Sequence, residues 1–160
     1  MSEYQAEIIW QLGAGEDFVG NTYSRGHVWH FDGGVSVPAS ASPHIVPLPH
    51  SVAENVDPEE AFVASLSSCH MLFFLSIAAK KRLQVERYTD KAVGTLAVAE
   101  NGKHCMTEVR LCPVAVFSGG EVTLAQIEAI HHKAHELCFI ANSVTSRVWV
   151  DLSLQRGGPD

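Results

Sequence analysis

The stretch from Ala61 to Ala79 contains no Asp, Glu, Lys or Arg over nineteen residues. A helix of this length that is apolar on most sides must be covered by lipid or by protein. Serine residues and His70 interrupt the run, and such polar side chains are unusual in a lone membrane span. We therefore expect a helix buried in protein and no membrane partner.

The residues before this run predict where the helix begins. Asp57 is placed to accept from the backbone at the N-cap, Pro58 suits the first turn, and Glu60 completes a capping box. The helix is predicted to continue to about Arg82.

The rest of the chain reads mainly as strands joined by turns. The sequences Asp32-Gly33-Gly34 and Asn101-Gly102 are typical of hairpin turns. Thr123 and Gln126 form a second capping box, which predicts another helix through about Cys138. Alternating apolar residues predict strands at Tyr4–Trp10, His27–Phe31, Val35–Val37, Tyr88–Ala99, Cys105–Phe117 and Arg147–Leu154. The order β-β-β-α-β-β-α-β predicts one α+β domain over residues 1–160, with antiparallel hairpins separated from two helices.

Composition limits the classes of partner. The net charge of −7 leaves no basic stripe for nucleic acid, so we expect no nucleic-acid partner. Only 18% of the residues are charged and 46% are hydrophobic, which favours self-association. The N-terminus is polar and acidic without a signal-peptide pattern, so we expect a cytoplasmic protein whose four cysteines are not a disulfide framework.

Cys69 lies in the middle of the uncharged run, beside His70. A thiol in an apolar helix is often inert packing, but it can be a nucleophile when its surroundings stabilise the thiolate. Burial raises the pKa of a thiol, so a reactive Cys69 needs a cation or hydrogen-bond donors. Arg25 is the leading candidate, and Glu59 could hold its guanidinium in a bidentate pair. The spacing alone leaves both interpretations of Cys69 open.

A second group of residues suggests a different chemistry. His131 and His135 are four residues apart on one face of the second predicted helix, and Cys138 follows on a similar face. This spacing is compatible with ligands of a zinc ion. A zinc-binding protein is therefore an alternative function. The same histidines could equally form an ordinary solvated face of the helix without a ligand.

The residues from Asp57 to Phe62, followed by Ser67-Ser68-Cys69, resemble the Asn-Pro-Glu-Glu/Gln…Ala-Cys signature of the OsmC/Ohr family. The segment from Lys133 to Cys138 resembles the helix that carries the second cysteine of that family. The family comprises osmotically inducible and organic hydroperoxide resistance proteins, so the resemblance implies a stress-response role.

The resemblance implies a metal-free thiol peroxidase without cofactors that reduces organic hydroperoxides. Cys69 would be the peroxidatic thiolate, Cys138 the resolving thiol, and Glu59 and Arg25 the charged partners. A small dithiol or thiol would then reduce the Cys69–Cys138 disulfide. The implied fold is an intertwined homodimer with antiparallel sheets around long central helices. A noncatalytic small-molecule carrier with the same dimer pocket is a further alternative.

Helix geometry adds an independent expectation. Ten residues of unbroken helix separate Glu59 from Cys69 by about 15 Å along the axis and by roughly 80° in facing. The two side chains then cannot share a hydrogen-bonded site within one subunit. Antiparallel pairing of two such helices would bring Glu59 of one chain near Cys69 of another, which again favours a homodimer. Phe62, Phe73 and Phe74 are expected to make the surroundings of Cys69 apolar and to favour alkyl hydroperoxides.

Overall fold

A computed structural model describes residues 1–156 of the chain. The chain divides into two compact units, the first formed by residues 1–61 and the second beginning at Phe62. The sequence predicts one domain over residues 1–160. Whether the two units form one domain depends on how they associate, so this stays a prediction.

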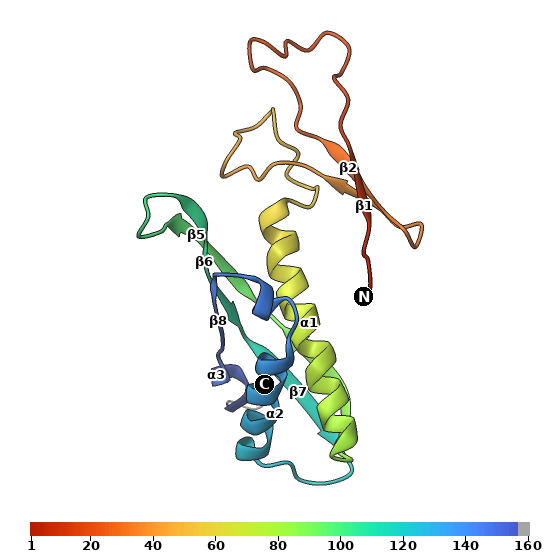
Figure 1. Cartoon of the computed structure of the whole chain (residues 1–160), viewed down its shortest axis with the longest axis vertical. Helices are drawn as coiled ribbons and strands as arrows, with labels where there is room; N and C mark the ends of the chain where they lie inside the picture. The colour runs from red at the N-terminus through yellow and green to blue at the C-terminus, as the bar shows by residue number, and fades with distance from the viewer. Residues whose placement is uncertain (157–160) are drawn as a thin grey trace. The chain divides into compact units, whose positions relative to one another are not determined.

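The first unit is built on a three-stranded antiparallel sheet in the order β1-β2-β3 (Figure 1). Its strands are β1 (Ala6–Ile9), β2 (His27–Phe31) and β3 (Ser36–Ala39). The long loop after β3 is held by local hydrogen bonds: Val52 N donates to Ser40 Oγ at 2.9 Å, and Asn55 Nδ2 donates to the Ala39 carbonyl. The antiparallel pairing of β2 with β3 confirms the hairpin predicted at Asp32-Gly33-Gly34. The loop after β3 is tied to the end of that strand.

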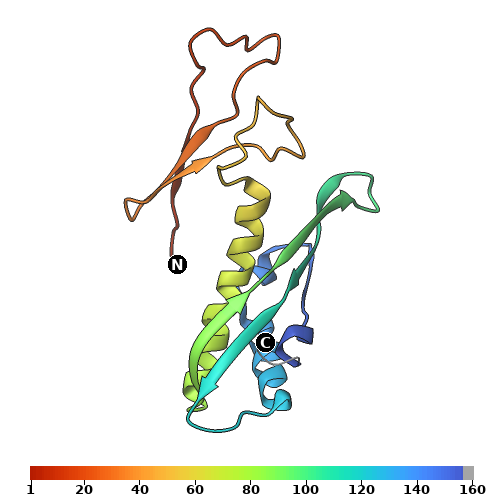
Figure 2. The same ribbon diagram turned by 180° about the vertical axis from the view of Figure 1, so that it is seen from behind.

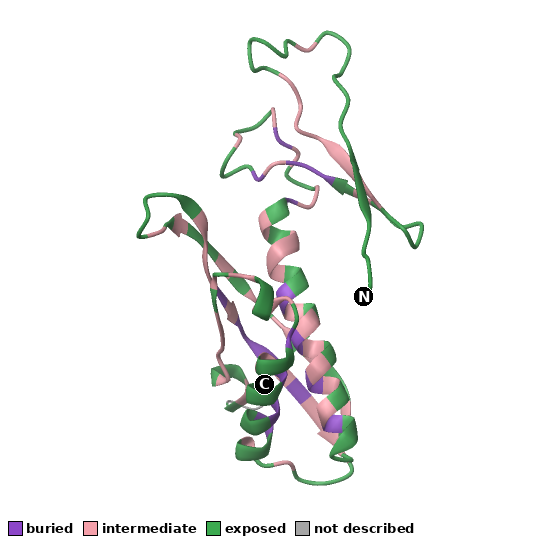
Figure 3. Cartoon of the chain, viewed as in Figure 1, coloured by how far each residue is buried: buried purple, intermediate pink, exposed green. Residues whose placement is uncertain are grey.

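Most residues of the first unit are exposed or only partly buried, as the mostly green and pink ribbon of Figure 3 shows, and several of the exposed ones are apolar. All four residues of β1 are exposed. The exposed large apolar side chains of this unit include Ile8, Trp10, Phe18, Val19, Val35 and Leu48. A sheet normally buries one of its faces, so this surface is suited to contact with protein.

The uncharged run forms α1, a single helix from Pro58 to Lys80. The predicted capping box is present: Glu60 N donates to Asp57 Oδ1 at 2.7 Å, and Asp57 N donates to Glu60 Oε2 at 3.2 Å. Leu66, His70, Phe74 and Ala78 are the buried residues of α1, and their four-residue spacing places them on one face. By length and composition alone, α1 could also cross a membrane.

The two long predicted strands at Tyr88–Ala99 and Cys105–Phe117 are each divided in the structure, so those predictions were wrong in extent. The observed strands are β4 (Gln84–Asp90), β5 (Val93–Val98), β6 (His104–Leu111) and β7 (Pro113–Ser118). β5 pairs with β6 and β4 pairs with β7, both antiparallel, and Figure 2 shows these strands from behind. Two features accompany the division between β6 and β7. Pro113 has no N–H to donate, and Cys112 N donates at 2.7 Å to the Asp90 carboxylate instead of to a strand.

The second unit is completed by elements that follow β7. Helix α2 spans Leu124–Leu137 and begins at Thr123 with the predicted capping box. After a short 3₁₀ turn, strand β8 (Arg147–Val150) joins β6 in parallel, an exception to the expected antiparallel pairing. The last predicted strand was too long, because Ser153–Arg156 forms the short helix α3.

The core of the second unit lies where α1, α2 and the strands meet. One cluster is formed by Phe74, Ala78, Ala115, Ile127, Ile130 and Ala134. A second cluster joins Leu66 of α1 to Val109 and Leu111 of β6. Figure 3 shows the buried residues of α1 along its length. These contacts hold α1 and α2 together and so place the residues on them.

Candidate functional site

Cys69 lies in the middle of α1, and Cys138 is the C-cap residue of α2. Cys69 is half-buried, whereas Cys138 is 1% exposed, and both are free thiols. The backbone turns after α2, so that Ala141 N donates to Cys138 Sγ at 3.4 Å. The packing of α1 against α2 brings the two sulfurs close enough for a hydrogen bond between the side chains.

The environment of Cys138 affects its titration. The pKa of Cys138 is raised to about 11, chiefly by burial, with smaller contributions from a hydrogen bond with Cys69 and from charge repulsion by that thiol. Backbone donors from Ala141 and Ile140 oppose this rise without overcoming it. Cys138 is therefore a protonated thiol at neutral pH, and Cys69 is the more accessible sulfur of the pair.

Beside the cysteines is a pair of buried histidines. His70 Nε2 and His131 Nδ1 are 2.9 Å apart, and the rings are stacked at a centroid distance of 5.2 Å with 7° between their planes. Burial lowers the pKa of His70 to about 4 and that of His131 to about 3, and in each case a neighbouring histidine contributes by repulsion. Both imidazoles are therefore neutral at physiological pH.

The apolar surroundings of the thiols differ from the expected set. Phe73, one turn after Cys69, makes an edge-to-face contact with Phe139 at a centroid distance of 5.0 Å. Phe74 is fully buried and faces His131 at 4.3 Å, so it belongs to the core. Phe62 packs against the cluster around Leu66. The apolar surface nearest the thiols is thus formed by Phe73 and Phe139.

Arg25 lies in the first unit, in the segment before β2. Its guanidinium donates to the carbonyls of Asn21 and Tyr23 and to Asn21 Oδ1, and it stacks on the Tyr23 ring at 3.8 Å. Its backbone N donates to the His50 carbonyl at 2.8 Å. The arginine is therefore held in a defined conformation by its own loop.

Glu59 lies in the first turn of α1. No ion pair among residues 1–156 involves Glu59 or Arg25, so the expected bidentate pair between them does not form within one chain. α1 is unbroken between Glu59 and Cys69. The expectation that these two side chains cannot meet within one chain required such an unbroken helix.

The zinc hypothesis finds no support in the side-chain geometry. His131 is engaged with His70, and His132 and Lys133 contact Glu136 on the exposed side of α2. Within residues 1–156, no group of three or more His, Cys, Asp or Glu side chains is arranged to hold a metal ion. His131, His135 and Cys138 are thus not a ready ligand set.

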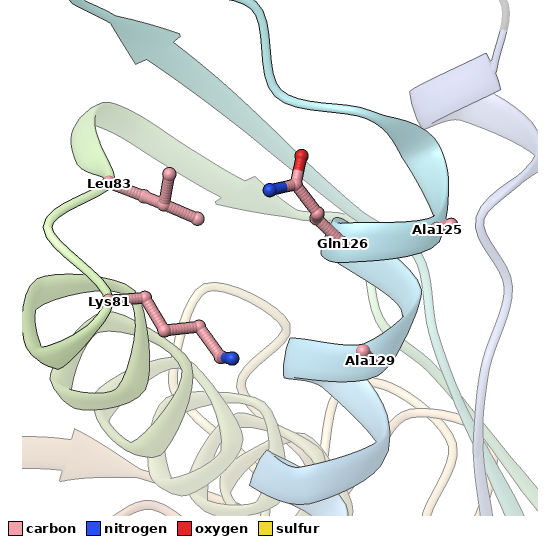
Figure 4. A pocket seen from close by; sticks show the side chains of 5 residues that line it. All are labelled: Lys81, Leu83, Ala125, Gln126 and Ala129. Atoms are coloured by element: carbon pink, nitrogen blue, oxygen red, sulfur yellow. The ribbon is translucent and has the colours of Figure 1, made fainter.

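A surface groove lies between the end of α1 and the beginning of α2, lined by Lys81, Leu83, Ala125, Gln126 and Ala129 (Figure 4). Neither cysteine contributes to its lining. The thiol pair is instead set into the contact between the two helices.

The histidine pair is the feature that sequence reasoning missed. His70 and His131 each stood out in the sequence, but as a neighbour of Cys69 and as a candidate zinc ligand. The one sequence feature that could have indicated the pair was the position of the two histidines on the predicted helices that also carry the cysteines.

Comparison with known proteins agrees with this fold. A family model described as OsmC-like protein matches residues 51–153. An OsmC-like protein of unknown function from Vibrio cholerae is 58% identical, with a TM-score of 0.93 over 94% of this chain and 99% of that one. No curated protein sequence matches the chain significantly.

More distant structures share the fold. An organic hydroperoxide resistance protein from Elizabethkingia anophelis is 18% identical, with a TM-score of 0.68 over 94% of this chain and 93% of its own. The organic hydroperoxide resistance protein OhrB of Bacillus subtilis is 14% identical, with a TM-score of 0.65 over 95% and 98%. The predicted mixed helix-and-sheet fold is confirmed, and the family model together with the Vibrio cholerae relative shows that the chain belongs to the OsmC-like protein family.

Proposed function

We propose that the protein is a thiol-dependent peroxidase that reduces organic hydroperoxides to alcohols. The observation that carries this proposal is the contact between an accessible thiol, Cys69, and a buried, protonated thiol, Cys138. Such a pair suits attack by the first sulfur and resolution by the second. The names of the Elizabethkingia anophelis and Bacillus subtilis proteins, which share the fold, point to the same class of substrate.

In the first step, the Cys69 thiolate attacks the distal oxygen of the hydroperoxide. The O–O bond breaks, the alkoxide takes a proton and leaves as the alcohol, and Cys69 becomes a sulfenic acid. Cys138 then attacks the Cys69 sulfur. The S–S bond forms, and hydroxide leaves as water with the proton that Cys138 gives up. A small dithiol returns two electrons and two protons by thiol–disulfide exchange.

Arg25 and Glu59 are proposed as the charged partners of the Cys69 thiolate. A guanidinium stabilises a neighbouring anion without itself losing a proton, and a carboxylate can hold the guanidinium in place. We further propose a homodimer in which these partners come from either chain. Support comes from the exposed apolar surface of residues 1–61 and from Leu72 of α1, which is 60% exposed.

The substrate would be an alkyl hydroperoxide rather than hydrogen peroxide. Phe73 and Phe139 present apolar surface beside Cys69, and burial of an alkyl chain against them favours the larger substrate. The reduced thiols require a reducing compartment, so we propose that the protein works in the cytoplasm.

The test is stopped-flow reduction of cumene hydroperoxide by wild type, Cys69→Ser and Cys138→Ser. We expect no fast reaction in Cys69→Ser, and a single turnover that stops at the sulfenic acid in Cys138→Ser. Cys105→Ser is the matched control, since Cys105 belongs to β6 and not to the two helices that position Cys69 and Cys138, and it should react as wild type. Retained turnover in Cys69→Ser would refute the assignment.

The same preparation separates the alternative functions. A small-molecule carrier would protect Cys69 from alkylation without consuming peroxide. A zinc protein would hold one equivalent of zinc by elemental analysis and lose it in His135→Ala. Either result without peroxide turnover would contradict the proposed peroxidase.

A further inference from the structure

We propose that the hydrogen bond between His70 and His131 is a positioning device for the thiol pair, holding α1 and α2 in the register at which Cys69 meets Cys138. Both histidines are positioning residues, and neither is required to touch the peroxide. The link to catalysis rests on the proposed function, but the positioning itself concerns only the two sulfurs.

Each helix carries one histidine of the buried pair and positions one of the two thiols, Cys69 within α1 and Cys138 at the C-cap of α2. His70 directly follows Cys69 on α1, and His131 lies seven residues, about two helical turns, before Cys138 on α2. The contact between His70 and His131 therefore ties α2 to α1 at a point one residue from Cys69 on α1 and about two turns from Cys138 on α2. A rotation or slide of either helix would break the 2.9 Å bond and separate the thiols together.

The surroundings of the pair make this bond specific. His70 is 1% exposed and His131 is 2% exposed, so neither nitrogen of the bond has access to bulk water as a substitute partner. The Phe74 ring packs against His131 at 4.3 Å, and Tyr88 of β4 lies beyond it at 6.3 Å. A buried polar group without its partner is costly, whereas apolar contacts tolerate small shifts. The pair therefore favours one helix register where leucines would allow several.

The far nitrogens of the two rings, His70 Nδ1 and His131 Nε2, have no hydrogen-bond partner among the described residues. Two neutral imidazoles joined by one hydrogen bond leave one N–H and one lone pair at these ends. The protein keeps these unsatisfied groups in its core although two apolar side chains would avoid them. A role beyond packing accounts for that arrangement.

Loss of the pair should lower the effective concentration of Cys138 at Cys69. The Cys69–Cys138 disulfide would then be less stable toward reduction, and the Cys69 sulfenic acid would persist longer before it condenses. Both effects follow from geometry alone, because the chemistry of the sulfurs is unchanged.

The experiment measures the equilibrium of the Cys69–Cys138 disulfide in dithiothreitol redox buffers, in a Cys105→Ser/Cys112→Ser background. His70→Leu and His131→Leu remove the hydrogen bond. His70→Gln and His131→Asn place an amide group near the nitrogen that each ring uses. His132→Leu is the matched control, since that side chain is 78% exposed on the same helix.

We expect the disulfide equilibrium constant to fall at least tenfold in the leucine variants, a shift of about 30 mV for two electrons. The amide variants should stay within about threefold of the background protein, and His132→Leu should not differ from it. A purely structural role predicts the opposite pattern, in which folded leucine variants retain the background equilibrium constant. That result, or amide variants as impaired as the leucine ones, overturns the proposal.

If a single leucine variant fails to fold, the double variant His70→Leu/His131→Leu leaves no imidazole stranded in the core and serves in its place, with the same expected loss. The measurement uses no peroxide, so its outcome is separate from that of the proposed function. A disulfide that weakens as expected in a protein without peroxide turnover refutes the peroxidase and supports the positioning role. Peroxide turnover combined with an unchanged disulfide equilibrium refutes the positioning role alone.

Discussion

Acidification from pH 7.5 to pH 5 should strongly destabilise this protein, because its core holds two neutral histidines. An unfolded histidine has a pKa near 6.5, whereas burial lowers the pKa of His70 to about 4 and that of His131 to about 3. Repulsion from His135 adds to the effect on His70, and repulsion from His70 adds to that on His131. Tyr88, the other titratable group beside the pair, stays protonated because burial raises its pKa.

The direction of the change in stability with pH follows from proton binding. Between pH 6.5 and pH 5, the unfolded chain binds protons at both positions while the folded chain binds almost none, so acid favours unfolding. The stabilisation is fully present above pH 6.5 and falls as the pH drops toward 4. At about 1.4 kcal/mol per pH unit for each histidine, the loss at pH 5 is about 2 kcal/mol each, or about 4 kcal/mol for the pair. Domains are typically stable by only about 5–15 kcal/mol, so the change is large.

The assay is urea unfolding followed by circular dichroism at pH 7.5, 6 and 5, at one fixed protein concentration. The control is the double variant His70→Gln/His131→Asn, which keeps polar groups in place but cannot titrate in this range. All other histidines are common to both proteins, so the difference between the two pH profiles isolates the pair. If both proteins lose the same free energy of unfolding between pH 7.5 and pH 5, the reasoning is wrong.

Two further predictions concern stability. Gln155 of α3 accepts from Ala115 N at 2.7 Å and donates to Ala115 O at 3.2 Å, so Gln155→Ala should cost about 1–3 kcal/mol in urea unfolding. The neighbouring Arg156→Ala breaks only an exposed ion pair and should cost less than about 1 kcal/mol; equal losses would contradict the role of the amide. Phe74→Ala should cost about 3–5 kcal/mol because the ring is fully buried against His131. Phe139→Ala, at a ring that is 71% exposed, should cost well under half as much in the same assay, and the reverse order would contradict the assignment of the core.

The local features of the fold could be predicted because their causes are local. Asp57 and Thr123 mark the helix starts with side chains that bond to the backbone three residues later, and both caps are confirmed. The division of the long strands could not be predicted in the same way. It involves the Asp90 carboxylate of β4 accepting from N of Cys112, the residue between β6 and β7, and these two residues are 22 positions apart in the chain.

In the candidate site, too, contacts between residues that are distant in the chain could not be predicted from the sequence. The sequence singled out Cys69 and Cys138 by their residue type and their resemblance to a family motif, but left open whether Cys69 is packing or a nucleophile. His70 and His131, 61 residues apart, were each noticed for another reason, because no periodicity links residues on different helices. The roles of Arg25 and Glu59 stay predictions.

The sequence by itself determined where the helices begin, that an uncharged α1 must be covered, and which side chains are the candidates for thiol chemistry. These properties follow from composition and from hydrogen bonds between near neighbours in the chain. Only the tertiary structure decided that Cys69 meets Cys138 and that His70 meets His131. The reason is physical: these contacts arise when α1 and α2 bury their apolar faces against the same strands, and burial then shifts the pKa values of His70, His131 and Cys138.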